Sequence, residues 1–339
     1  MDGNWKRQLD ALRDDLERRG DPAAWVKEVD AAHASVRYAH FSVRGPVFGV
    51  AVQDPAAGPG WRLLKPVTDG MPQMARDGLN SHLFFTAKDD TEDRAVRREL
   101  LAAVAVLDRE PVNEVEACGV RYRVVRGDEF TRSDDDGGLE PPRPTDPEPV
   151  EPSWDRQARD TPYREIGFAL DPEHTEGPME GALKLALRDF SYTGSRYPAR
   201  MRADSERAVR THPDIVLLPA GFTVAEHEEQ GWRPLTRLAP TPHAARRSLY
   251  NGLEEIWAML YQYDDAKKAR YAKAAEEYRA LGRADEFRVD DRLFRICRIE
   301  RMIRMGPDGP ETPRPSDHDE YGPMKIHPTM DEDGTVHYE

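Results

Sequence analysis

The chain repeats part of its own sequence, and this feature constrains its fold more than any other. GLEPPRPTD, which ends at Asp146, aligns with GPETPRPSD, which ends at Asp317, with six identities in nine positions. At the same offset of 171 residues, GWRLLKPVTDGMPQMARDGLN from Gly60 aligns with GWRPLTRLAPTPHAARRSLYN from Gly231. Because a repeated sequence indicates a repeated structural unit, these stretches predict one chain path that occurs twice.

The similarity extends on both sides with small changes of offset. YRVVRGDEFTR from Tyr122 aligns with FRICRIERMIR from Phe294, and VRYAHFSVRGP from Val36 aligns with VRTHPDIVLLP from Val209. The offset changes at polar or glycine-rich segments, where loops tolerate insertions. We therefore predict two copies of a unit of about 125 residues, at 22–146 and 195–317. A chance similarity between low-complexity segments is the alternative.

Each copy is predicted to contain a helix, two strands, two helices, a β-hairpin and an extended proline-rich strap. The hairpins are expected to turn at Cys118–Gly119 and at Asp290–Asp291. The PRP sequence that follows each hairpin cannot continue a helix, so it should run extended over the surface. The fold class is α+β, with the two copies related by a pseudo-twofold axis and a groove between them.

Apolar residues near helical spacing mark the helices that should face the core. In the first copy they are Met74, Leu79, Leu83 and Phe84. In the second copy they are Leu249, Leu253, Ile256, Trp257 and Leu260.

Three segments lie outside the copies. Residues 1–21 are predicted to form an N-terminal helix, and residues 318–339 a C-terminal extension. Residues 147–194 are predicted to form a proline-rich linker, mobile in its first part, followed by a strand and a helix.

Composition narrows the class of protein. The formal net charge of −14 disfavours binding to nucleic acid or to an anionic membrane. No apolar run is long enough for a membrane helix, and the N-terminus lacks the apolar core of a signal peptide, so we expect a cytoplasmic protein without membrane contact. The two cysteines, Cys118 and Cys297, cannot build a disulfide framework and are expected to be small core residues.

The sequence carries no motif that specifies a reaction. Nucleotide-binding glycine loops, the GxSxG elbow and HExxH are absent, and the ten histidines lack the spacing of zinc ligands. We therefore predict no catalytic residue, no cofactor and no metal, and we favour a non-catalytic protein over an enzyme.

Arginines and tryptophans shared by the two copies form the candidate ligand or partner surface. Two interpretations stay open for the arginines, which either pair with carboxylates of their own unit or line an anion-binding groove. The tryptophans either anchor a strand to the core or offer a stacking surface. The residues are Arg123, Arg126, Arg295, Arg298, Trp61 and Trp232.

The strings RYRVVR, GPDGPETPRPSD and YGPMKIHPTMDEDGTVHY together resemble a family of hypothetical proteins from high-GC actinobacteria, known only as a domain of unknown function. The resemblance covers most of the chain. It implies a bacterial cytoplasmic protein, and it brings no known activity, cofactor or catalytic residue. The acidic SDDDGG of the first copy departs from the GPDG turn of the second.

Two functions follow as hypotheses. The first is a non-catalytic binding or scaffold protein that presents the surface between the copies to another protein. The second is an enzyme or sensor that binds a small anionic ligand in the groove between the copies. The sequence leaves the oligomeric state open.

Overall fold

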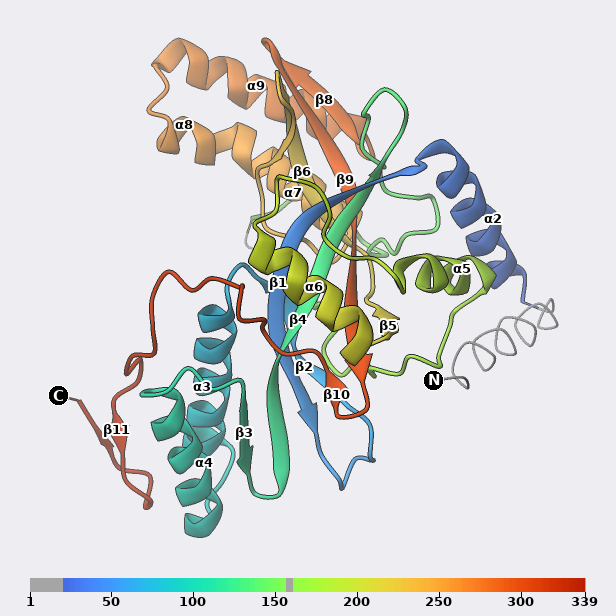
Figure 1. The fold of residues 1–339 in the computed structure, drawn as a ribbon. Coiled ribbons are helices and arrows are strands. Elements are labelled where there is room, and N and C mark those ends of the chain that lie inside the picture. Colours follow the sequence, from blue (N-terminus) through green and yellow to red (C-terminus); the bar gives the residue numbers. More distant parts are fainter. Residues whose placement is uncertain (1–20, 157–160, 339) are drawn as a thin grey trace.

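The computed structural model describes residues 21–156 and 161–338, so the predicted N-terminal helix at 1–21 lies outside the described residues except for Asp21. The protein has a mixed α+β fold with a large antiparallel sheet that curls into a half-barrel. Helices lie on both sides of this sheet (Figure 1). None of the described helices has the length and apolar character needed to cross a membrane.

Two long strands form the centre of the sheet. They are β4 (Val120–Ser133) and β9 (Arg292–Gly306), which pair with each other antiparallel over four residue pairs. The strand order β2-β1-β4-β9-β6-β7 places them side by side in the middle (Figure 1). All contacts between the two sides of the sheet therefore pass through this central pair and the segments that cover it.

The N-terminal side of the sheet, residues 22–146, is called the first half. Asp21 caps its first helix by accepting a hydrogen bond from the Ala23 amide at 2.9 Å, and proline occupies the first helical position. Its elements in order are α2 (Pro22–Arg37), β1 (His40–Gln53), β2 (Arg62–Asp69), α3 (Pro72–Asp89), α4 (Arg94–Leu107), β3 (Glu114–Ala117) and β4.

The C-terminal side, residues 195–317, is called the second half. It differs from the first half in that two short strands, broken at Pro219, stand where the first half has the single strand β1. Its elements are α6 (Ala199–Thr211), β5 (Asp214–Leu217), β6 (Gly221–Glu228), β7 (Gly231–Pro234), α7 (Pro242–Asn251), η1 (Gly252–Ile256), α8 (Trp257–Leu260), α9 (Asp265–Leu281), β8 (Glu286–Val289), β9 and β10 (Gly309–Pro310).

Both predicted hairpin turns are confirmed. Ala117 pairs with Val120 and Val289 pairs with Arg292, so two residues close each turn. Cys118 and Asp290 have φ values of 55° and 53°, as the first position of a tight hairpin turn requires. The turn also exposes Cys118, so the prediction that it is a core residue was wrong, whereas Cys297 is fully buried.

The two halves have separate hydrophobic cores. In the first half, α3 and α4 pack on the sheet through Leu79, Leu83 and Leu100, which are almost fully buried. In the second half, α7 and α9 pack through residues such as Leu249 and Tyr271. Each core forms where the apolar side of the helices meets the apolar side of the sheet.

The helix after α7 departs from the prediction. Leu249, Leu253 and Trp257 are buried as expected, but Ile256 and Leu260 are 40% and 65% exposed. The cause is η1, a π-helical turn that holds one residue more than an α-helical turn and so rotates every later residue about the axis. Trp257 takes the inward position, and the apolar residues beside it face outward.

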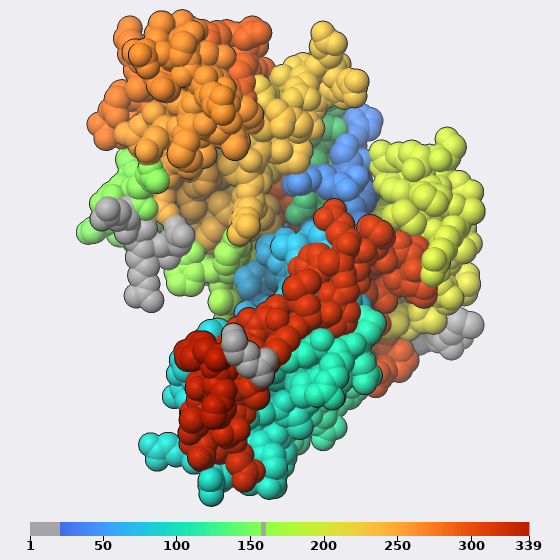
Figure 2. All heavy atoms as spheres, turned by 90° about the vertical axis from the view of Figure 1, so that its left-hand side faces the viewer, coloured from blue at the N-terminus to red at the C-terminus, as the bar shows by residue number. Residues whose placement is uncertain are grey.

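Two segments beyond the straps pack against the sheet halves. The C-terminal segment, which contains β11 (Thr329–Met330) and β12 (Val336–His337), lies along α3 and α4 of the first half (Figure 2). The linker places Trp154 against Tyr250 and Tyr278 of the second half, so residues 147–156 are packed, contrary to their predicted mobility. The rest of the linker contains α5 (Pro178–Leu187), as predicted, but has only a single bridge, Arg62 to Ala169, in place of the predicted strand.

The packing of Trp257 across η1 makes a testable requirement at Gly252. A Cβ atom at this position would lie 2.7 Å from Cε2 of Trp257. Helix propensity favours alanine over glycine by about 1 kcal/mol, but crowding a packed core costs about 1 to 3 kcal/mol. We predict that Gly252→Ala lowers the free energy of unfolding in urea by about 1 kcal/mol. Gly60→Ala, where a Cβ meets nothing within 4 Å, should be neutral; a stabilised Gly252→Ala protein would contradict this account.

Candidate functional site

The candidate arginines Arg126 and Arg298 lie at the centre of the sheet, on β4 and β9, and are engaged by carboxylates. Arg126 is 1% exposed and forms ion pairs with Asp128 and Asp317, both at 3.0 Å. Its guanidinium also donates to the Tyr192 hydroxyl at 3.0 Å. Asp317 belongs to the second half, so this pairing joins the two halves.

Arg298 has the corresponding surroundings. It pairs with Glu300 on its own strand and with Asp146 of the first half at 3.3 Å. Burial raises the pKa of the Glu300 carboxyl, but the charges of Arg298, Arg132 and Arg143 outweigh this and lower the pKa to about 2. The buried carboxylate therefore stays ionised because cations surround it.

The straps, residues 138–146 and 309–317, cross from one half to the other. The amide of Arg126 donates to the carbonyl of Glu311, and the amide of Arg298 donates to the carbonyl of Glu140, both at 2.9 Å. The strap that follows β4 thus pairs with β9, and the strap that follows β9 pairs with β4. Each half is completed by a segment of the other half.

The outer candidates form a second set of matched contacts. Arg123 lies over the ring of Trp61 at 4.7 Å and pairs with Glu114 at 2.6 Å. Arg295 lies over the ring of Trp232 at 4.9 Å and pairs with Glu286 at 2.7 Å. These tryptophan and arginine side chains stack on each other, as cation–π geometry favours.

A cavity of about 500 Å³ lies beside the central strand pair, and none of the six candidate residues lines it. Side chains from both halves and from the linker converge on it. Its charged and aromatic residues are Arg44, Asp69, Glu129, Tyr163 and Arg237, and its apolar wall contains Val47, Met74 and Leu238. We call it the central pocket. Its size and mixed lining are typical of small-molecule sites.

The charges of the central pocket are unequally satisfied. Arg44 forms an ion pair with the buried Glu129 at 2.7 Å. Arg237 is exposed and, within the described part of the chain, forms no hydrogen bond or ion pair of its own. Burial raises the pKa of Asp69 to about 6, although Lys65 and Arg237 act to lower it. The pocket thus holds one unpaired cation and one carboxyl that gains a proton just below neutral pH.

On the same face of the sheet, Arg301 shows how such a position is filled by the chain itself. Glu129 and Arg301 are directly opposed on β4 and β9, so their side chains project from the same face. The guanidinium of Arg301 pairs with Glu165 of the linker at 2.6 Å, with both side chains buried. The linker therefore occupies the space around Arg301, while the space around Glu129 stays open as the central pocket.

Sequence reasoning did not find the residues of the central pocket. Arg44, Asp69 and Arg237 are single charged residues near strand ends, and no motif or repeated position distinguishes them. Glu129 stands in the aligned string RGDEFTR, but it aligns with arginine rather than with a second glutamate. Among the described residues, no group of three or more metal-ligating side chains is close enough to hold a metal ion.

The paired carboxylates predict a specific loss of stability when Arg298 is removed. Arg298→Met leaves Glu300 and Asp146 with one cation fewer, and breaking a buried ion pair costs about 3 kcal/mol. Because the folded pKa of Glu300 is lowered, its contribution to stability is complete above the unfolded pKa of 4.5 and is lost as the pH falls toward about 2. The destabilisation measured by urea unfolding should therefore be larger at pH 7 than at about pH 3.

Arg288→Met is the matched control, because Arg288 is an exposed arginine on the neighbouring strand β8. It should change the free energy of unfolding by less than about 0.5 kcal/mol. Equal effects of the two substitutions, or an Arg298→Met effect that is the same at both pH values, would contradict the assigned ion pairs.

Comparison with known families gives one match. Residues 21–320 match a family described as "Family of unknown function (DUF5954)". No curated protein and no solved structure matches the chain. Because the match spans both halves, both straps and the linker, the chain belongs to the family of unknown function DUF5954.

Proposed function

We propose that the chain arose by internal duplication, with copies at 22–146 and 195–317 related by a pseudo-twofold axis between β4 and β9. The register of the central pair supports this. Arg126 aligns with Arg298 at an offset of 172 residues, and the same offset takes Glu129 to Arg301, the residue that pairs with it directly. An axis that exchanges the copies would therefore pass between Glu129 and Arg301.

Matched hydrogen bonds support the same proposal. The side chain of Arg143 donates to Glu140, and the side chain of Arg314 donates to Glu311, both at 2.6 Å. Farther out, Arg76 donates to Asn113 at 2.7 Å, as Arg246 does to Asp285. Contacts preserved between aligned positions at four offsets along the chain are expected of a duplication and are unexpected from chance similarity.

For function, we propose a non-catalytic binding protein that holds a small anionic molecule in the central pocket. The single observation that carries this proposal is Arg237, a cation that lines a cavity of about 500 Å³ and has no carboxylate partner among the described residues. The other central arginines are already neutralised by pairing. An anionic group of a ligand would give Arg237 a charge-assisted hydrogen bond.

The rest of the pocket is consistent with such a ligand. The hydroxyl of Tyr163 donates to the carbonyl of Leu238 at 2.5 Å, which fixes one wall. Val47 and Met74 offer an apolar surface for the body of the molecule. The lining contains no cysteine, serine or histidine, the usual nucleophiles and bases, which supports binding over catalysis.

The geometry favours this hypothesis over a scaffold that presents the surface between the halves to another protein. The space between the halves at the central pocket is concave and charged, whereas a protein interface needs a broad surface with an apolar centre. Arg123, Arg126, Arg295 and Arg298 stay candidates only as supports of the sheet, since carboxylates occupy them. The cytoplasmic location and the actinobacterial origin stay predictions from the sequence.

Thermal stabilisation tests the proposed site. The folded protein is heated with a panel of small carboxylates and phosphates, with inorganic phosphate and citrate included, and binding is then measured by calorimetry. A ligand at about 100 times its Kd should stabilise the protein by about 2.7 kcal/mol, which raises the Tm by several degrees. Because protonation of Asp69 removes a negative charge from the pocket, binding should be tighter at pH 5.5 than at pH 7.5.

Arg237→Gln should abolish the Tm shift without changing the Tm of the free protein, since Arg237 holds no structural contact. Arg288→Gln, an exposed arginine outside the pocket, should leave the shift unchanged. If no anion in the panel raises the Tm, or if Arg237→Gln binds as well as the wild type, the proposed function is rejected.

A further inference from the structure

A group of apolar side chains on α8 faces outward, and the π-helical turn explains why. Ile256, Met259, Leu260 and Tyr261 are 40%, 72%, 65% and 48% exposed. The rotation introduced by η1 turns Trp257 inward and leaves these four residues outside. Clustered exposed apolar residues of this kind mark interaction surfaces.

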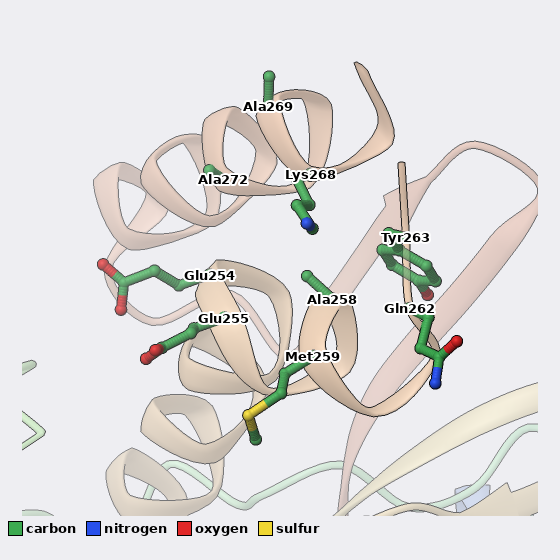
Figure 3. A pocket seen from close by; sticks show the side chains of 9 residues that line it. All are labelled: Glu254, Glu255, Ala258, Met259, Gln262, Tyr263, Lys268, Ala269 and Ala272. Carbon is green, nitrogen blue, oxygen red and sulfur yellow. The ribbon is translucent and has the colours of Figure 1, made fainter. Parts of the chain in front are cut away.

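A groove lies next to these residues, between α8 and α9. It encloses about 700 Å³, and small residues, Ala258, Ala269 and Ala272, form its apolar surface. Figure 3 shows Lys268 pointing from α9 toward Ala258, while Met259 projects from α8. In the space-filling view the two helices form a projecting orange lobe (Figure 2). A projecting thioether and a groove floored by alanines therefore lie on one face.

The charges around the groove are arranged with opposite signs on its two sides. Glu254 and Glu255 project from the η1 side, and Lys268 projects from α9. All three are exposed. Glu255 also pairs with the exposed Arg156, and Lys268 pairs with the exposed Asp265, contacts that solvent screens.

We propose that this face binds a second copy of the same chain. A twofold rotation places Met259 of each copy against the alanine-floored groove of the other copy. The same rotation brings the glutamates of one copy to Lys268 of its partner. A surface that carries both a projection and a groove, and both signs of charge, is complementary to itself, which is the requirement for a twofold interface.

The proposed dimer is weak and reversible. Four exposed apolar side chains and a shallow groove provide less contact than the roughly 1,600 Å² that a stable complex buries. The dimer is independent of the central pocket, because none of its residues lines that pocket. Its formation or absence therefore leaves the proposed ligand site unaffected.

Sedimentation velocity of the full chain over a hundredfold range of concentration tests the proposal. The expected result is a shift from monomer to dimer as concentration rises. Met259→Asp should remove the dimer, because it places a charge in the apolar contact. Val36→Asp, at a position on α2 that is 82% exposed, is the control and should dimerise like the wild type. Circular dichroism and unchanged Tm values would show that both variants are folded.

Charge reversal separates a twofold interface from nonspecific association. Glu254→Lys and Lys268→Glu should each weaken the dimer by about tenfold, because each puts like charges in contact twice. An equimolar mixture of the two variants should form a mixed dimer, since both contacts then join opposite charges. A chain that stays monomeric throughout, a dimer that survives Met259→Asp, or reversed variants that fail to recombine would overturn the proposal.

Discussion

The fold depends on buried guanidinium–carboxylate pairs that join the two halves across β4 and β9. Arg126 reaches Asp317 of the second strap, and Arg298 reaches Asp146 of the first strap. The backbone repeats this crossing, because each strap accepts a hydrogen bond from the central strand of the opposite half. Neither half can bury its own central arginine without a segment of the other half.

This arrangement accounts for the inertness of the most prominent arginines. A buried arginine without a partner would cost several kcal/mol, so the sequence places a carboxylate at each one. A ligand would have to displace these carboxylates. The central pocket is therefore found beside the paired arginines, where the linker fills the space around Arg301 but leaves the space around Glu129 open.

The elements that have a local sequence signal could be predicted, whereas the tertiary arrangement of charges could not. The hairpin turns at Cys118 and Asp290 follow from alternation and turn residues, and the α+β class follows from the succession of periodicities. The π-helical turn escaped prediction because Leu249, Leu253, Ile256 and Leu260 fit an uninterrupted helix equally well; only the packing of Trp257 on Gly252 selects the other arrangement. Arg237 and Asp69 escaped because their neighbours come from distant parts of the chain.

Native-state hydrogen exchange at two amides tests the crossed pairing most directly. The amides of Arg126 and Arg298 donate to straps of the opposite halves. If the halves form one cooperative unit, both amides exchange only through global unfolding, and their protection falls together as urea is added. If one amide exchanges at a much lower free energy than the other, the straps open independently, and the account of two mutually completed halves is wrong.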